Sequence, residues 1–424
     1  MMAAMLFITF LLLIFFSVPI AFSLGLASLL YIILAEIPFN IIPQKMFGGI
    51  NSFTLLCIPG FILAGNLMNA GGITDRIIDF AKKLVGDIRG GLGLANVGAS
   101  MGFAGITGTA LADVASIGAV MIPAMKKEGY DAPFSVAVTS SSSTIGPIIP
   151  PSLPMIILGS LATISIGDLF IAGIIPGILL TLSLMVITYI ISKKNNYPKG
   201  ERHQFNDIVK SFFGAFWALM MTVIILFGIL SGFFTPTEAS IVAVVYALIV
   251  GLFVYRDLKL HMIPKIFLDS MVSTASIMVL VGMANLFGWI LVSEQIPQLV
   301  ANAILAISEN PIIVILLINL LLLFVGTFME TIAALVILFP VLLPVATQIG
   351  MDPVHFGVMM VLNLMIGLST PPVGVCLFVA SSIGKVSIGQ ATKALIPFLS
   401  VSLLVLLAVS YIPSLTLFLP SLLD

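Results

Sequence analysis

Four short polar segments interrupt the long apolar runs of this 424-residue chain, and they carry most of the side chains that could bind a solute. Two are Gly105–Asp113 and Gly326–Thr331, and two are Thr139–Ser152 and Gly367–Gly374. Each contains Gly or Pro, which break a helix, and each contains hydroxyl side chains. Freed carbonyls and hydroxyls are hard ligands that suit a small cation, whereas the positive ends of half-helices suit a carboxylate.

These segments predict two cation sites, each formed by one Gly-rich segment and one broken helix. The expected cation ligands are Thr107, Thr109, Ser142, Thr144 and Gly146 in the first site, and Gly326, Thr327, Gly367 and Thr370 in the second. A bound anion would lie between the two sites, near Gly108, Asp113, Ser143, Pro150, Glu330 and Pro371. For one isolated break, a kinked helix with Ser and Thr as packing contacts is the better explanation. Four breaks in two matched pairs favour a binding site.

Three carboxylates are placed to lie inside a membrane. Asp113 and Glu330 come just after the two Gly-rich segments. Each could bind a cation or a proton, or could instead cap the N-terminus of a half-helix, and both possibilities stay open. Glu238 follows Thr235-Pro236 at an expected helix start, where a capping role is favoured.

The four breaks belong to an internal repeat. Residues 105–176 match residues 326–397 without a gap, and half of the identical positions are Gly or Pro. The pair Pro150-Pro151 falls on Pro371-Pro372. Because Gly and Pro fix the shape of the backbone, the halves share a pattern of helix breaks. We therefore expect a first repeat at 1–192, a connector at 193–210 and a second repeat at 211–424.

Composition indicates an all-α polytopic membrane protein. The chain is 60% hydrophobic and 8% charged, against about 25% charged residues in a soluble domain. Its apolar runs, such as Met46–Asn69 and Ile266–Val292, are too long for a transmembrane barrel. Cys57 and Cys376 are the only cysteines, so a disulfide scaffold is not expected. We find no nucleophile or metal constellation of a membrane enzyme, and we expect no nucleic-acid partner.

The distribution of Lys and Arg predicts how the two repeats are oriented. The run Gly91–Met125 has basic residues on both flanks, whereas Ile312–Ala346 has none in either flanking segment. By the positive-inside rule, each run is a re-entrant hairpin, one entering from the cytoplasm and the other from outside. The chain is then an inverted repeat with two re-entrant hairpins and two broken helices, as in many secondary transporters. Both termini are expected to be external.

With these motifs in place, the chain resembles the large membrane subunit of a tripartite ATP-independent periplasmic (TRAP) transporter. The resemblance covers nearly the whole chain. It is carried by Ile58–Phe61, Ala64–Met68, Gly105–Asp113, Thr139–Pro151, Gly232–Ala239, Gly326–Glu330 and Ser369–Gly374. Asn66 departs from the pattern, because an acidic residue is expected more often there.

The resemblance implies sodium-driven uptake of a small organic acid, such as a C4-dicarboxylate, sialic acid or another acidic sugar, across a bacterial inner membrane. It makes Na⁺ the cation of both sites. It also implies a periplasmic substrate-binding protein and a small four-helix membrane subunit, expected as separate polypeptides. The implied fold is an elevator-type ion transporter, with 91–161 and 312–383 as the transport domain and the remainder as scaffold. A stand-alone cation-coupled carrier that needs no binding protein is the alternative.

Overall fold

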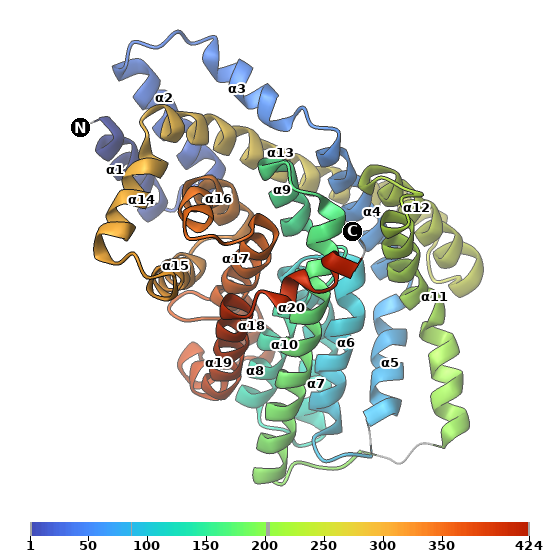
Figure 1. Ribbon diagram of the computed structural model, residues 1–424. Coiled ribbons are helices and arrows are strands. Elements are labelled where there is room, and N and C mark those ends of the chain that lie inside the picture. Colours follow the sequence, from blue (N-terminus) through green and yellow to red (C-terminus); the bar gives the residue numbers. More distant parts are fainter. Residues whose placement is uncertain (1, 86, 201–203, 423–424) are drawn as a thin grey trace.

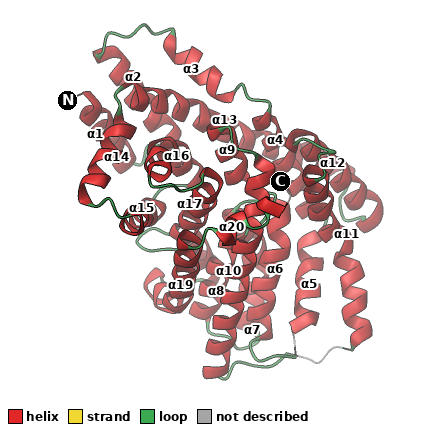
Figure 2. Ribbon diagram, viewed as in Figure 1, coloured by secondary structure: helices red, strands yellow, loops and turns green. Residues whose placement is uncertain are grey.

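The computed structural model describes residues 2–85, 87–200 and 204–422. Within these ranges every regular element is helical, which confirms the all-α prediction (Figures 1 and 2). Six helices of the described residues are long and apolar enough to span a membrane: Ile166–Lys194, Phe205–Leu230, Pro236–Tyr255, Leu260–Ser293, Thr331–Gln348 and Ile388–Tyr411. The apolar run expected at Met46–Asn69 is not one straight helix. It forms two helices, Ile41–Ile50 and Thr54–Ala70, bent by 65° around Asn51-Ser52.

One group of helices lies along the top and right of Figure 1. It consists of α1 (Met2–Phe15), α2 (Ile20–Leu34), α3 (Ile41–Ile50), α4 (Cys57–Ala70), α11 (Phe205–Leu230), α12 (Pro236–Ile249) and α13 (Ile263–Ser293). α4 packs against α12 and α13, and α2 packs against α13. Asn66 joins α4 to α13, since its amide donates to Ser270 Oγ over 2.8 Å. The expected cap at Glu238 is confirmed, because Thr235 and Glu238 form a capping box.

The first re-entrant hairpin consists of α6 (Gly91–Thr107) and α7 (Ala110–Lys127). Its two ends meet the same connector segment, since Gly90 N–H and Tyr130 Oη both donate to the carbonyl of Pro198. The hairpin therefore starts and finishes on one side of the molecule, as its basic flanks predicted. The chain continues through α8 (Ala132–Ser142), the 3₁₀ turn η2 (Ser143–Ile145), α9 (Leu153–Ala162) and α10 (Ile166–Lys194).

The second hairpin consists of α15 (Pro311–Gly326) and α16 (Thr331–Gln348). It is followed by α17 (Pro353–Gly367), α18 (Val375–Gly384), α19 (Ile388–Tyr411) and α20 (Ser414–Leu417). Its two ends also lie together, because Ile312 and Ile349 line one surface pocket. Tyr411 Oη, at the end of α19, donates to the carbonyl of Ile312 over 2.9 Å.

The two hairpins open toward opposite sides of the molecule. Lys126 Nζ, at the open end of the first hairpin, donates to the carbonyl of Gly384, just before α19. The far end of α19 touches the open end of the second hairpin through Tyr411. A helix of 24 residues is about 36 Å long, enough to separate the two open ends by a membrane thickness. The predicted inverted repeat is therefore present in the fold.

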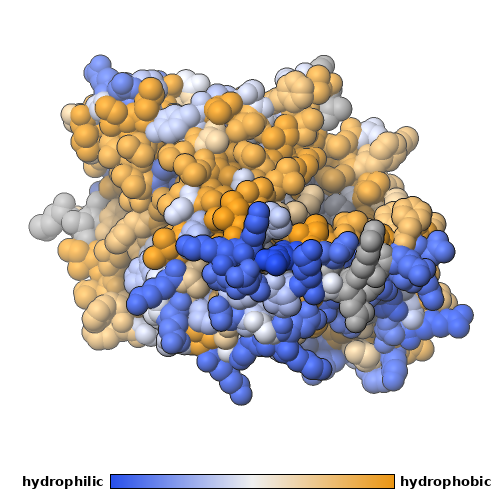
Figure 3. All heavy atoms as spheres, turned by 90° about the horizontal axis from the view of Figure 1, so that it is seen from below, coloured by the Kyte–Doolittle hydropathy of each residue, from blue (hydrophilic) through white to orange (hydrophobic). Residues whose placement is uncertain are grey.

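Basic side chains gather at the open end of the first hairpin. This end carries Arg89, Lys126, Lys127, Lys193, Lys194 and Lys199. Figure 3, which looks at the molecule from below, shows hydrophilic side chains over one part of the face and hydrophobic ones over the rest. Residues 201–203 of the predicted connector lie outside the described residues.

Two amphipathic helices, here called the arm helices, link α1–α4 and α11–α13, here called the scaffold helices, to the two hairpins. α5 (Ile73–Val85) precedes the first hairpin, and α14 (Ile296–Ile307) precedes the second. α5 buries Ile73, Ile77 and Ile78, the spacing of one helix face. Both arms begin next to a residue with left-handed φ: Gly72 (φ 75°) before α5 and Gln295 (φ 56°) before α14.

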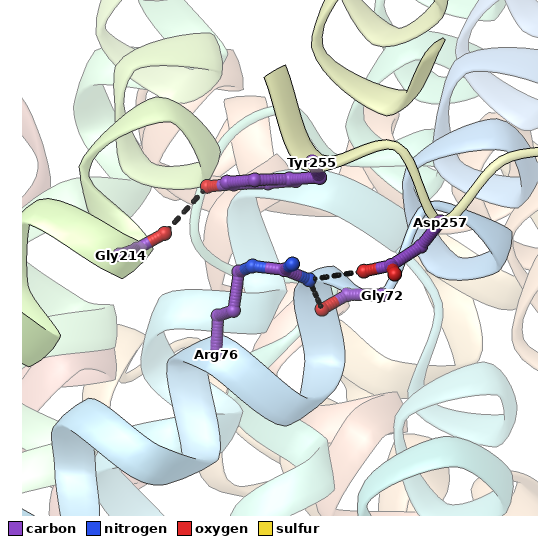
Figure 4. Close-up of polar contacts among 5 residues, drawn as sticks. All are labelled: Gly72, Arg76, Gly214, Tyr255 and Asp257. Atoms are coloured by element: carbon purple, nitrogen blue, oxygen red, sulfur yellow. Dashed lines mark hydrogen bonds and ion pairs between the residues drawn. The ribbon is translucent and has the colours of Figure 1, made fainter. Parts of the chain in front are cut away.

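A polar cluster fixes the start of α5 to the scaffold helices (Figure 4). Arg76 Nη1 donates to Asp257 Oδ2 and to the carbonyl of Gly72, each over 2.7 Å. The guanidinium also stacks on Tyr255, 4.0 Å from the ring centroid, and Tyr255 Oη donates to the carbonyl of Gly214 in α11. The start of α14 has a related contact, in which Tyr31 of α2 donates to Glu294. Each arm is therefore anchored where it leaves the scaffold.

We predict that Gly72→Ala weakens the anchor of α5. A Cβ at this position would lie 2.5 Å from Asp257 Oδ2 and 2.7 Å from Arg76 Nη1, so the pair must separate. Gly350→Ala is the control, because Gly350 also has positive φ (81°) and nothing lies within 4 Å of the added Cβ. Both changes bear a backbone cost of about 1 kcal/mol. Gly72→Ala should lower the unfolding temperature in detergent further than Gly350→Ala, and equal shifts would contradict the anchor.

Candidate functional site

The tip of the first hairpin packs against the break of the first long helix. Gly108, with φ 59°, lies so close to Pro151 that an added Cβ would be 2.7 Å from the Pro151 carbonyl oxygen. Gly146 is in ordinary van der Waals contact with the carbonyl of Thr109, with 3.6 Å from its Cβ position to the oxygen. The bond Pro150-Pro151 is cis. The sequence prediction that this tip meets this break is confirmed.

The second tip and the second break form the equivalent contact. The backbones of Gly326 and Gly367 touch, since a Cβ on Gly367 would lie 2.7 Å from Gly326 Cα. Gly374 N–H donates to the carbonyl of Thr327 over 3.1 Å. Gly326 and Gly367 correspond to Gly105 and Gly146 in the repeat, and the bond Pro371-Pro372 is also cis. Glycine is required at 326 and 367 because two backbones approach each other there.

The two tip-and-break units touch each other at their centres. Ser369 Oγ donates to the carbonyl of Ser140 over 2.9 Å, and Ser140 Oγ lies 3.4 Å from Ser369 Oγ. Both serines are buried. All four polar segments singled out in the sequence therefore belong to one continuous structure.

A cavity of about 330 Å³ lies where the two units meet the scaffold helix α13. This volume falls within the roughly 300–1,000 Å³ of small-molecule sites. Its lining comes from both tips, both breaks and α13: Gly108, Thr109, Ala110, Leu111, Pro147, Pro154, Ser276, Ile277, Leu280, Glu330, Thr331, Ile332, Met365 and Leu368. Among these described lining residues, only Glu330 has a charged side chain.

The starts of three half-helices converge on this cavity, and their caps differ. α16 is capped by Glu330, whose carboxylate accepts from Ala333 N–H over 3.1 Å. α9 is capped by Ser152, whose Oγ accepts from Met155 N–H. Thr109 occupies the cap position of α7 but makes no capping bond with its side chain. The first N–H groups of α7 therefore lack a side-chain partner at the cavity wall, where an anion is stabilised.

The positions of the two candidate carboxylates separate their roles. Glu330 caps α16 and also lines the cavity. Asp113 caps nothing. It is fully buried between the hairpin arms, where Oδ2 accepts from Ser100 Oγ over 2.9 Å and Oδ1 has no hydrogen-bond partner in the described structure. Ser100 in turn lies 3.0 Å from Ser142 Oγ of the broken helix. Asp113 thus faces the break rather than the cavity.

Three of the predicted threonine ligands share one orientation. Thr144 Oγ1 donates to the carbonyl of Ser141, Thr327 Oγ1 to that of Phe324, and Thr370 Oγ1 to that of Ile366, over 2.7, 2.8 and 2.7 Å. Ser142 and Ser143 also donate to carbonyls of their own helix. A hydroxyl that has used its proton this way keeps its lone pairs for a cation. The side chain of Thr107, at the end of α6, lies outside the described part of the structure.

Sequence reasoning located part of the cavity lining and missed the rest. Gly108 and Glu330, which were predicted to contact the substrate, line the cavity, and so does Thr109, which was predicted as a cation ligand. Their contacts with a ligand stay predictions. Asp113, Ser143, Pro150 and Pro371 lie outside this lining, and their contact with a substrate stays a prediction. Thr331 and Ser276 line the cavity but were not predicted. Thr331, whose buried Oγ1 has no partner, could have been found as the first helical residue after the second tip.

We predict that Gly367→Ala abolishes transport. Its Cβ would meet backbone atoms of Gly326, which cannot rotate away, and overpacking of this kind costs about 1–3 kcal/mol. The second tip must then separate from the second break. Gly389→Ala in α19 is the control, because nothing lies within 4 Å of its added Cβ. Uptake should be lost in the first variant and kept in the second. Uptake at the parental rate by Gly367→Ala would contradict the close contact.

Comparisons with known proteins agree with this architecture. The family model of the tripartite ATP-independent periplasmic transporter DctM component matches residues 7–415. The sialic acid TRAP transporter large permease protein SiaM of Vibrio cholerae is 46% identical over 97% of this chain and 96% of its own length. The C4-dicarboxylate TRAP transporter large permease protein DctM of Pseudomonas aeruginosa is 42% identical over 94% of each chain.

Among solved structures, the YdaH transporter of Alcanivorax borkumensis has a TM-score of 0.64 over 88% of this chain and 87% of that chain. At 14% identity this similarity shows the fold alone. The relatives are transport permeases, so the chain is a transporter subunit rather than an enzyme. With its inverted hairpins, its paired helix breaks and a family match over nearly its full length, the chain belongs to the large-subunit (DctM) family of TRAP transporters.

Proposed function

We propose that this subunit imports a small organic acid across a bacterial inner membrane, coupled to sodium, by an elevator movement. The observation that carries the proposal is the cavity between the two hairpin tips, with an uncapped helix start at its wall and an oxygen-rich break on each side. An anion and small cations are the ligands that these groups suit.

The carboxylate of the substrate would bind at the start of α7. There Gly108, Thr109 and Ala110 line the cavity, and the first N–H groups of the helix lack a side-chain cap. The start of α16 is a poorer anion site, because the carboxylate of Glu330 already accepts from its N–H group and would repel a second anion. Thr331 Oγ1, which is buried and unpartnered, is available for a hydroxyl or a carboxylate oxygen.

Sodium would occupy the two tip-and-break contacts. In each, threonine hydroxyls donate their proton inward and leave lone pairs outward, as Thr144 and Thr370 do. Bound sodium would also supply positive charge near an anionic substrate. Among the described lining residues the charged one is Glu330, which is acidic. The positive charge that attracts an anionic substrate would therefore have to come from the ions and the start of α7.

The moving unit would comprise both hairpins and both broken helices. We include α10 and α19 with it, because they pack against α6, α8 and α17; from the sequence alone they fell to the scaffold. The scaffold would then be α1–α4 and α11–α13. The two arm helices, anchored through Arg76 and Glu294 at their scaffold ends, would pivot about these ends as the unit moves.

Sialic acid is the first substrate to test and a C4-dicarboxylate the second. The Vibrio cholerae relative named for sialic acid is 46% identical to this chain, and the Pseudomonas aeruginosa relative named for C4-dicarboxylates is 42% identical. A small four-helix membrane subunit and a periplasmic binding protein would complete the transporter. Both termini would be periplasmic, because in Figure 1 both lie away from the basic loops that follow α7 and α10.

We predict that Thr144→Val and Thr370→Val raise the sodium concentration needed for half-maximal uptake. Each replaces a ligand oxygen with a methyl group and should cost about 1–3 kcal/mol where the ion cannot find another partner. Thr181→Val is the matched control, because Thr181 is also buried and also donates to a carbonyl of its own helix, in α10. Uptake would be measured in vesicles against a sodium gradient. Sodium-independent uptake, or unchanged sodium dependence in both variants, would refute these sites.

We also predict that uptake requires the partner proteins. In the described residues the chain is helical and largely apolar, with no separate domain to capture a scarce solute. A docked binding protein would supply substrate at high local concentration and stabilise the outward state. Reconstitution with and without each partner should give robust uptake only when all three components are present. Sodium-driven uptake by this chain alone would favour the stand-alone carrier instead.

A further inference from the structure

The first half of α13 exposes polar side chains in a membrane-spanning helix. The segment that contains α13, Leu260–Ser293, is a candidate membrane span, and an 18-residue window within it has a mean hydropathy of 2.1. Yet Asp269, Ser273 and Ser276 are all exposed. No hydrogen bond or ion pair within the described residues satisfies the Asp269 carboxylate. A carboxylate and hydroxyls facing lipid tails would cost several kcal/mol, so this face of α13 needs another environment.

These residues form one stripe that points toward the cavity. At about 100° per residue, Asp269, Ser273, Ser276 and Leu280 fall within about 60° of one another around the helix. Ser276 and Leu280 line the cavity between the hairpin tips. The neighbouring face is turned toward α4, where buried Ser270 accepts from Asn66. Ser276 and Leu280 therefore face the hairpin tips, and Asp269 and Ser273 continue the same side of the helix away from the cavity.

The stripe also runs toward the basic side of the molecule. α13 begins at Ile263, after Arg256 and Lys259 and next to Lys265. From Asp269 to Ser276 the helix rises about 10 Å. Polar groups thus extend from the region of these basic residues to the cavity, where Thr331 Oγ1 is buried without a partner.

We propose that the stripe Asp269–Ser273–Ser276 is one wall of an aqueous path between the cavity and the basic side, and that Ser276 contacts the transported solute. The proposal rests on the proposed function. The scaffold then supplies a specificity residue, because Ser276 belongs to α13 while the other polar lining side chains come from the hairpins. The Ser276 hydroxyl donates to the carbonyl of Val272, so its lone pairs can accept from a hydroxyl or amide of the solute.

Cysteine accessibility tests the path without relying on transport. Single cysteines at Asp269, Ser273 and Ser276 would be made in a chain with Cys57→Ala and Cys376→Ala, and reconstituted with the small subunit. The controls are Leu268→Cys and Ala275→Cys, which are also exposed but lie about 100–120° around the helix from Asp269. A negatively charged, membrane-impermeant methanethiosulfonate should modify the stripe at least about tenfold faster than the controls, because thiols in lipid do not ionise. Equal rates on both faces would overturn the path.

Solute contact is tested by protection and by kinetics. N-acetylneuraminate or succinate, whichever is transported, should slow modification of Ser276→Cys and leave Asp269→Cys unchanged. Ser276→Ala should raise KM about three- to tenfold with little change in kcat, as expected for one lost hydrogen bond, and Ser276→Thr should restore it. Unchanged KM together with no protection would overturn the contact. Rapid labelling of the stripe combined with sodium-independent uptake would leave the path standing and remove the coupling proposal.

Discussion

The interaction on which this structure depends is the burial of interrupted backbone inside the protein. A helix that breaks within a membrane leaves N–H and C=O groups that lipid cannot satisfy. Here each break is covered by the tip of a hairpin, and the cover is close enough that Gly326 and Gly367 touch through their backbones. The hairpins exist for this reason, because a straight spanning helix could not present its own end at that depth.

The two halves keep the same backbone and differ in side chains, and the differences have chemical meaning. Thr109 stands at the N-cap of α7 but does not cap it with its side chain. Glu330, at the equivalent position of the second half, caps the start of α16. Ser142 bonds with Ser100 in the first half, while Asn363, its equivalent, donates to Asn319 in the second. An inverted repeat of identical side chains would give two equal sites. Divergence at these positions gives one open helix start and one capped one beside a single cavity.

Much of the fold was predictable from sequence, because Gly, Pro, Lys and Arg act locally. Gly and Pro located the breaks, and the flanking charges gave the opposite openings of the hairpins. The side chains that line the cavity were harder to predict from the sequence. Ser276 lies in the apolar run Ile266–Val292, and only the packing of α13 decides which of its faces meets the hairpins. The bend at Asn51-Ser52 was missed although Gly48 and Gly49 precede it, because the apolar residues on both sides were joined into one run by hydropathy alone. The cap at Glu330 and the absence of one at Asp113 required the positions of the neighbouring N–H groups.

The two arm helices have nearly the same length, 13 residues in α5 and 12 in α14, or about 20 and 18 Å. Each joins the scaffold to one of two hairpins that open to opposite sides. If the hairpins move against the scaffold helices as one rigid body, as we propose, two links of equal length form a parallelogram linkage when their attachment points are equally spaced on both bodies. In such a linkage both links swing through the same angle, so that the carried body shifts while its orientation stays constant. The cavity and the groups around it would then keep their mutual geometry throughout the stroke, and an extension of one arm by a single helical turn would convert the shift into a tilt.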